Sequence, residues 1–417
     1  MIRISRPSLL ATLLLATLAV PTLASAATTE ELEAKLQALA AQLDDVKSEL
    51  AELKSQRAAS NAPAPAAVET NPNFFGYGEL NFSQLSNDSS SATGDVARFV
   101  IGMGYRFDDK TRLVSELEVE HAVASADDPG EIEVEQAYIE RDLSNGMFAK
   151  AGLFLIPSGL LNESHEPTRY YGVFRNFVET AIIPTTWREG GVEVEGNTES
   201  GLRWNVGVTT SVDLSKWDAT SEEGRETPLG SIHQELVLAR AKDLGVFGAL
   251  NYTGIPGLRL GGSVFTSGAG QGQPGFEDSR MLLWEGHARY NPGAFELSAL
   301  YARGHISNTR AINLTLVGNP TLIPEDFFGW YVEGAWHAWQ TDSMALSPFV
   351  RYETFNTGSS YANLGIGLTP DALEDRKVWT GGLNFSLAPG VVIKVDYLKF
   401  TGESAQDRFD LGLGYQF

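Results

Sequence analysis

The feature that most constrains the fold is a series of about sixteen short segments in which apolar and polar residues alternate. The segments are 74–84, 95–107, 111–122, 131–142, 146–156, 187–196, 200–213, 246–254, 257–267, 279–291, 293–305, 328–339, 344–355, 376–388, 390–401 and 405–417. Alternation with period two is typical of β-strands whose two faces meet different surroundings. An even number of segments, each near the roughly 9–11 residues of a tilted membrane-spanning strand, predicts an all-β fold, an antiparallel transmembrane barrel.

The connections between these segments alternate in length. Every second connection is short and rich in turn-forming residues: 108–110, 143–145, 197–199, 255–256, 292, 340–343 and 389. The long ones include 157–186, 214–245, 268–278, 306–327 and 356–375. A membrane barrel keeps its short turns on one side, whereas a soluble β-sandwich has no reason to do so. The stretch 214–245 could hold a further pair of strands, and its acidic beginning is expected to be a solvated loop.

The last segment shows the alternation most clearly. Phe409, Leu411, Leu413, Tyr415 and Phe417 share one face, and the residues between them are polar or small. In lipid every backbone polar group must be paired, which a closed barrel achieves, with apolar side chains outward and polar ones inward. The same parity predicts a charged inner wall that includes Arg98, Arg106, Glu116, Glu118, Lys150, Arg203, Arg289, Arg351 and Lys394. It also gathers an acidic sector on consecutive strands: Glu116, Glu118, Glu120, Glu133, Glu135, Glu189, Glu193 and Glu195.

Three segments of different composition precede the barrel segment, 73–417. Residues 1–26 have a basic start, an apolar stretch and a small-residue ending, which predicts an export signal rather than an uncleaved anchor helix. Residues 27–57 carry a seven-residue repeat that predicts a coiled-coil oligomerisation segment; its core positions are Leu32, Leu36, Leu39, Leu43, Val46, Leu50 and Leu53. A lone amphipathic helix lying on its own domain or on a membrane is the alternative. Residues 58–72 form a Pro/Ala linker.

The third long connection, 157–186, is too apolar for a solvated external loop. It contains Tyr170, Tyr171, Val173, Phe174, Phe177, Ile182 and Ile183. A barrel of about sixteen strands is too wide for its own side chains to fill, so we expect this segment to fold inward and to narrow the lumen. The predicted constriction residues are Glu163, His165, Glu166, Arg169, Arg175, Glu179 and Arg188. The alternative is an external loop that packs on a neighbouring subunit.

Composition excludes several classes of function. The 417 residues carry a formal charge of −22 and no cysteine. An acidic chain is a poor nucleic-acid ligand, and the absence of cysteine excludes disulfides and thiolate chemistry. Ser164, His165 and Glu166 are adjacent and cannot form a catalytic relay, and no His-x-x-x-His metal pair is present. The sequence therefore predicts neither an enzyme nor a bound cofactor or metal.

Taken together, these features resemble the phosphate-selective porin O/P family of trimeric bacterial outer-membrane channels. The resemblance is most specific from Ala149 to Gly196, in the runs Ala-Gly-Leu-Phe-Leu-Ile-Pro, His-Glu-Pro and Pro-Thr-Thr-Trp-Arg-Glu-Gly-Gly. It implies a homotrimer in contact with outer-membrane lipid and lipopolysaccharide, with the coiled coil in the periplasm. It also implies that Arg169, Arg175 and Arg188 lie near the constriction. This sequence differs in its acidity and in lacking a Lys-rich stripe.

The predicted function is passive diffusion of small hydrophilic solutes through a porin narrowed by residues 157–186. The acidic sector favours cations, whereas the arginines near the constriction favour anionic or zwitterionic solutes, because local charges dominate at a narrow, poorly hydrated point. We expect the anionic or zwitterionic preference. The alternative is a structural anchor or cell-wall tether, in which the barrel only holds the chain in the membrane.

Overall fold

The computed structural model describes residues 71–417, which belong to one compact unit. The predicted export signal, the coiled coil with its seven core residues, and the linker up to residue 70 lie outside the described residues. The strands are β1 (Asn73–Leu85), β2 (Thr93–Asp108), β3 (Thr111–Glu120), β4 (Ile132–Ser144), β5 (Met147–Leu155), β6 (Arg188–Asn197), β7 (Leu202–Thr209), β8 (Gly245–Tyr252), β9 (Leu258–Gly268), β10 (Arg280–Tyr290), β11 (Phe295–Ser307), β12 (Asp326–Trp336), β13 (Trp339–Gln340), β14 (Ala345–Ser360), β15 (Arg376–Ala388), β16 (Val391–Phe400) and β17 (Arg408–Gln416).

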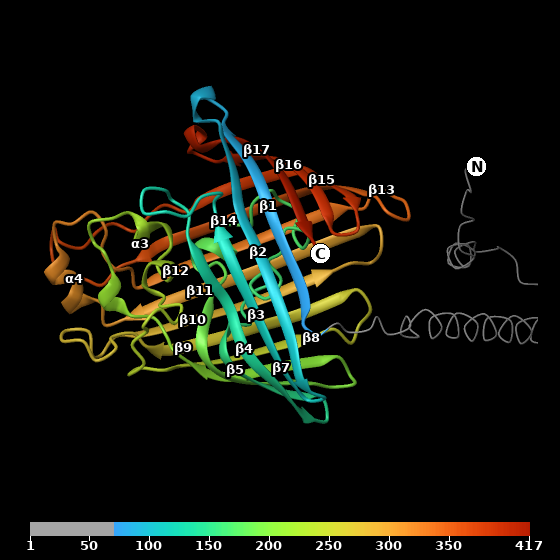
Figure 1. Cartoon of the computed structure of the whole chain (residues 1–417). Helices are drawn as coiled ribbons and strands as arrows, with labels where there is room; N and C mark the ends of the chain where they lie inside the picture. Colours follow the sequence, from blue (N-terminus) through green and yellow to red (C-terminus); the bar gives the residue numbers. More distant parts are fainter. Residues whose placement is uncertain (1–70) are drawn as a thin grey trace, which may run out of the picture. The chain divides into compact units, whose positions relative to one another are not determined.

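The strands close into an antiparallel barrel (Figure 1). Each long strand pairs with its neighbours in the chain, and β1 closes the sheet by pairing with both β2 and β17. The two-residue β13 lies within the turn between β12 and β14, which pair directly, so the wall has sixteen strands. This confirms the predicted all-β barrel and its strand number. All sixteen predicted segments are strands.

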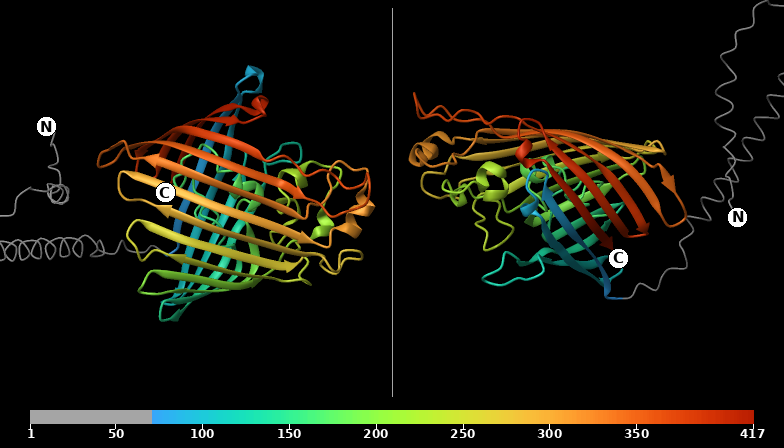
Figure 2. Two further views of the ribbon diagram at one scale, coloured as in Figure 1. Left: turned by 180° about the vertical axis from the view of Figure 1, so that it is seen from behind. Right: turned by 90° about the horizontal axis from the view of Figure 1, so that it is seen from above.

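The short and long connections lie at opposite ends of the barrel, as their alternation predicted (Figure 2). The turn between β4 and β5 shows why the short ones are tight. Asn145 and Gly146 have φ of 55° and 73°, as a two-residue hairpin turn requires. The helices of the described residues lie in connections at the long-loop end: η1 (Ser89–Ser91), η2 (Val178–Ile182), η3 (Leu214–Lys216), α3 (Glu223–Glu226), η4 (Gly230–Ile232), α4 (Arg310–Leu316) and η5 (Ser404–Gln406).

Side-chain burial alternates along the strands as the sequence pattern predicts. On β16, Val392, Lys394 and Asp396 are buried, while Ile393 and Tyr397 are exposed on the outer face. One part of the inner wall departs from the predicted polarity. Near the long connections the inward positions are apolar, as with Phe265 on β9, Met281 on β10 and Phe327 on β12.

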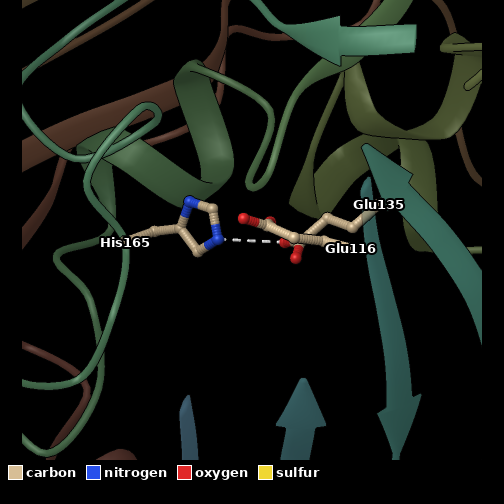
Figure 3. Close-up of side chains that lie close together, drawn as sticks. All are labelled: Glu116, Glu135 and His165. Carbon is tan, nitrogen blue, oxygen red and sulfur yellow. Dashed lines mark ion pairs between the residues drawn. The ribbon is translucent and has the colours of Figure 1, made fainter. Parts of the chain in front are cut away.

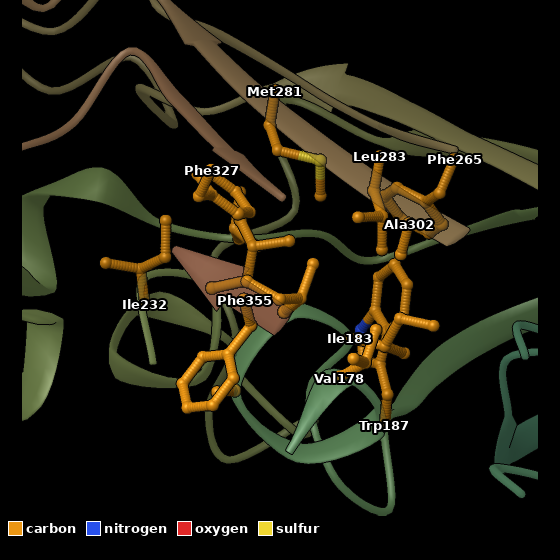
Figure 4. Packing of buried hydrophobic residues seen from close by; sticks show 14 of the residues in the cluster. Val178, Ile183, Trp187, Ile232, Phe265, Met281, Leu283, Ala302, Phe327 and Phe355 are labelled. Carbon is orange, nitrogen blue, oxygen red and sulfur yellow. The ribbon is translucent and has the colours of Figure 1, made fainter. Parts of the chain in front are cut away.

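These apolar inward residues belong to a hydrophobic cluster at this end of the barrel (Figure 4). The strands contribute one side of the cluster, and the connections 157–186 and 210–244 contribute the other. Val178 and Ile183 come from the first connection, and Leu229 and Ile232 come from the second. Burying side chains of this size stabilises a fold by about 1.5–3 kcal/mol each. The inner wall is apolar here because it packs against folded connections rather than against water.

The connection 210–244 contains no strand. Its acidic beginning is solvated in part, because Asp218, Glu222, Glu223 and Glu226 are exposed as expected, whereas its first acidic residue is buried. Asp213 is 1 % exposed and forms an ion pair of 2.7 Å with Arg240, and Leu214 is fully buried. The segment therefore packs as a compact cap against the inner wall.

Candidate functional site

The connection 157–186, called the lumen loop below, contacts inward-facing residues on several sides of the barrel. The backbone N–H of Phe177 donates to Glu353 on β14 at 2.7 Å, and that of Val173 donates to Asp396 on β16 at 2.7 Å. Thr168 donates to Gln416, at the end of β17 beside the short turns, at 2.7 Å. Because the loop leaves and re-enters the wall at the other end, it runs through the inside of the barrel.

Glu179 holds the two arms of the lumen loop together. Its carboxylate accepts hydrogen bonds from the backbone N–H groups of Leu160 and Leu161 at 2.6 and 2.8 Å, from Asn176 at 2.8 Å and from Tyr331 on β12 at 3.0 Å. The residue is only 4 % exposed. The structure thus places Glu179 inside the loop rather than on an open lumen surface.

Arg98 and Lys394 tie the loop to the wall. Arg98 is buried, forms a 2.8 Å ion pair with Glu79 and donates to the carbonyl of His165. The ammonium of Lys394 donates to the carbonyl of Gly172 at 2.8 Å and lies 3.6 Å from the centre of the Tyr170 ring. Burial, reinforced by the adjacent Glu79 carboxylate, raises the pKa of the Tyr170 hydroxyl. Both predicted wall bases therefore contact the loop.

The three arginines expected near the constriction have different surroundings. Arg188 is buried and paired with Glu133 and Glu235. Arg175 is half-buried and donates to Thr186 at 3.1 Å. The side chain of Arg169 is 56 % exposed, with Glu166 at 3.8 Å. Of the three, only Arg169 presents an open guanidinium.

Arg169 lines a cavity of about 500 Å³ at the short-turn end of the barrel. Tyr171 from the loop, Arg289 and Glu296 from the wall, and His337 from the turn after β12 line the same cavity. Arg289 on β10 lies 3.6 Å from Glu296. On the adjacent strand β9, Arg259 is directly opposite Arg289. The cavity therefore holds two arginines and a carboxylate, a set of groups that suits an anionic or zwitterionic solute.

A second set of charged residues joins the loop to strands β5, β6 and β7. Arg203 on β7 pairs with Glu163 of the loop at 2.8 Å and with Glu195 at 2.9 Å. Lys150 on β5 pairs with Glu193 at 3.1 Å. These predicted wall and constriction residues neutralise one another in part.

The other predicted site residues are distributed more widely. Arg351 is buried between Glu333 and Glu353, each at 3.1 Å. Arg106 is exposed near the end of β2, where its backbone N–H donates to the side-chain oxygen of Asn71 at 2.9 Å. His165, Glu116 and Glu118 are buried. His165 lies beside Glu116 where the loop meets β3 and β4 (Figure 3). The structure therefore brings His165 and Glu116 together and leaves Arg106 apart.

Sequence reasoning missed several residues of this site. Tyr77 contacts both His165 and Glu135, and the carboxylate of Asp396 receives the loop backbone. Their inward parity was visible in the sequence. The path of the loop, which decides what they contact, was not.

Comparison with known proteins finds the same barrel architecture. The chain is similar to OmpF of Salmonella typhi (14 % identity, TM-score 0.59, covering 83 % of this chain and 97 % of that one). It is also similar to an anion-selective porin from Comamonas acidovorans (11 %, TM-score 0.52, covering 83 % and 99 %). A third similar structure is the outer membrane channel DcaP of Acinetobacter baumannii (11 %, TM-score 0.51, covering 83 % and 97 %). At these identities the likeness shows the fold alone.

Sequence comparison adds little about function. An uncharacterised protein of Aquifex aeolicus is 26 % identical over 347 residues, covering 80 % of this chain and 76 % of that protein. No family model matches the chain, so membership of the phosphate-selective porin O/P family stays a prediction. Among residues 71–417, no helix is long and apolar enough to cross a membrane.

Proposed function

We propose that the chain is a bacterial outer-membrane porin for small hydrophilic solutes, narrowed by the lumen loop and favouring anionic or zwitterionic species. The observation that carries the proposal is the combination of two surfaces on one closed wall. The outer face is apolar, and the inner face is charged and lined in part by a loop that runs through the barrel. A wall of this kind separates lipid from water.

The outer face supports the membrane location. Exposed apolar residues occur on most strands, among them Ile101 (45 % exposed), Val192 (57 %) and Leu250 (57 %). Aromatic side chains also meet across the outer face, where Trp330 contacts Tyr352 and Tyr352 contacts Trp379. Soluble monomers rarely expose so much contiguous apolar surface. A band of apolar and aromatic residues is typical of membrane barrels.

The cavity beside Arg169 supports the solute preference. Arg259 has Asn251 as its hydrogen-bond partner at 3.0 Å, and within residues 71–417 no carboxylate lies within 4 Å of its guanidinium. Arg169, Arg259 and Arg289 bring three positive charges to this sector, against the carboxylates of Glu166 and Glu296. Glu296 offers a nearby site for the ammonium group of a zwitterion. Lumen charges near a constriction set selectivity.

Planar-bilayer recording tests the channel. The purified, folded protein is expected to give stepwise, water-filled conductances, because sixteen strands enclose more space than their side chains fill. Folding is checked independently by the change of gel mobility on heating. Folded protein that never conducts would contradict the channel and favour the anchor or tether, in which the lumen loop and the cap 210–244 would close the barrel.

A homotrimer is part of the proposal, with its coiled coil in the periplasm and its barrels in contact with lipid and lipopolysaccharide. The chain enters β1 at the short-turn end, which is the periplasmic side of such barrels. Deleting residues 28–57 is expected to weaken but not abolish the trimer, since roughly three heptads are marginal alone. Native mass spectrometry measures this, and monomers from the intact chain would contradict it.

A further inference from the structure

Four side chains from four separate elements meet at one buried point where the lumen loop touches the wall, and Figure 3 shows three of them, Glu116, Glu135 and His165. His165 comes from the loop, Tyr77 from β1, Glu116 from β3 and Glu135 from β4. His165 Nε2 lies 3.0 Å from Glu135 Oε1 and 2.6 Å from the Tyr77 hydroxyl. One ligand atom from each of Glu116, Glu135 and His165 lies within 4.8 Å of the other two. Both glutamates and the histidine are less than 9 % exposed.

The imidazole of His165 is oriented with its Nε2 lone pair toward the two carboxylates. Its Nδ1 lies 2.9 Å from the carbonyl oxygen of Asn162. A carbonyl can only accept, so Nδ1 carries the hydrogen, and in the neutral ring Nε2 has none. A histidine held by an Nδ1–H to carbonyl bond is the usual arrangement in metal sites, because that bond fixes the ring and its tautomer. The carboxylate of Glu116 is also held by a hydrogen bond, which the side-chain amide of Gln136 donates to it at 2.8 Å.

Glu135 leaves an oxygen atom without a hydrogen-bond partner in this cluster. Its Oε2 accepts the single hydrogen of the Tyr77 hydroxyl at 2.8 Å. Its Oε1 is buried and accepts no hydrogen bond, although Nε2 is its neighbour. The lone pairs of Nε2, Glu135 Oε1 and the Tyr77 oxygen therefore converge on the same space. Lone pairs this close repel each other unless a cation lies between them.

The balance of charge also calls for a cation. Glu116, Glu118 and Glu135 are all buried here, and Glu118 lies close enough to Glu135 to interact with it electrostatically. The nearby buried base is Arg98, which is already paired with Glu79. Ionised carboxylates that are buried without compensating positive charge are strongly destabilising, so such groups take up either protons or a cation. A divalent ion would neutralise the excess.

We propose that Glu116, Glu135, His165 and Tyr77 form a binding site for a first-row divalent transition metal ion of the Zn²⁺ type. One imidazole nitrogen with two carboxylates favours such ions over Ca²⁺ or Mg²⁺, which prefer oxygen ligands alone. Ligands about 2.1 Å from a tetrahedral metal lie roughly 3.4 Å apart, and here the ligand atoms of Glu116, Glu135 and His165 lie within 4.8 Å of one another. The sequence predicted no metal because the ligands are spread over 88 residues.

The metal would join the lumen loop to the wall, because His165 is in the loop and the other ligands are in strands. This proposal goes beyond solute passage and does not depend on it. Equilibrium metal binding can therefore succeed or fail whatever the bilayer recordings show.

Calorimetric titration of chelator-treated, folded protein with Zn²⁺ tests the site. We expect one ion per chain, and Co²⁺ in the same site should give the visible absorption of a coordinated ion. His165→Gln and Glu135→Gln should each weaken binding by at least about tenfold, since even groups that only orient ligands change affinity 10–100-fold. Glu116→Gln, nearly identical in shape, replaces either variant that does not fold.

His287→Gln is the matched control. His287 is also buried in the barrel, 2.8 Å from Glu285 and 2.9 Å from Asn251, but it is not part of a three-ligand cluster in the described chain. Its Zn²⁺ affinity should equal that of the native protein. Absence of Zn²⁺ binding, tighter binding of Ca²⁺ than of Zn²⁺, or equal Zn²⁺ affinity in the native protein and the folded ligand variants would each overturn the proposal. The cation at this point would then be a proton on His165.

Discussion

Replacing Glu179 with alanine is expected to destabilise the barrel by about 3–5 kcal/mol and to raise its conductance. The carboxylate accepts four hydrogen bonds that join residues 160–161 to residue 176 and to Tyr331 on the wall. Its removal leaves buried donors without an acceptor, and breaking a buried charged network costs about this much. Gly159, with φ of 77°, curves its backbone around the same carboxylate. Without this carboxylate the two arms of the loop separate and the lumen widens.

Urea denaturation and single-channel recording measure the two effects. Glu163→Ala is the matched control, because it removes the same side chain from the same loop. The Glu163 side chain is 23 % exposed, and its partner Arg203 stays paired with Glu195 when Glu163 is replaced, so the expected cost is smaller than that of Glu179→Ala. Equal denaturation midpoints and conductances for the two variants would show that Glu179 does not hold the loop in place.

The strands could be predicted because period-two alternation and loop length are both local properties of the sequence. The same evidence fails where a loop is buried. Segment 200–213 is predicted as one strand, but β7 ends at Thr209, and Val212 is part of the hydrophobic cluster at the long-connection end. Alternation in 210–213 does not distinguish the end of a strand from a loop that packs on the inner wall. The acidic residues of 213–226 likewise concealed buried apolar partners such as Leu214 and Trp217.

The sequence could predict which residues of the candidate site face the inside of the barrel, but not which residues they contact. Parity placed Arg98, Glu116 and Lys394 on the inner face, and all three are buried there. Their partners depend on the route of the lumen loop, which no periodicity describes. Lys394, for example, donates to the carbonyl of Gly172, 222 residues away. Parity also could not predict which arginine is accessible to solutes. Arg188 is buried, whereas the side chain of Arg169 is 56 % exposed.

Arg169→Ala and Arg289→Ala are expected to produce the largest change in ion preference, lowering the ratio of anion to cation permeability severalfold. Both arginines line the same cavity. A charge about 8 Å from a passing ion, at an effective dielectric constant of about 40, contributes about 1 kcal/mol, or roughly fivefold in local ion concentration. Reversal potentials in a salt gradient measure the ratio, and the double variant should shift it further.

Two controls separate a lumen charge from other effects of removing an arginine. Arg225→Ala removes the same side chain from α3 in a long connection, where its guanidinium is 52 % exposed, so screening within roughly 8 Å should leave selectivity unchanged. Arg188→Ala removes an arginine that is buried between Glu133 and Glu235. It should destabilise the fold while changing selectivity less than Arg169→Ala. If Arg225→Ala shifts the reversal potential as much as Arg169→Ala, net charge governs selectivity. If no variant shifts it, the solute path avoids the cavity beside Arg169.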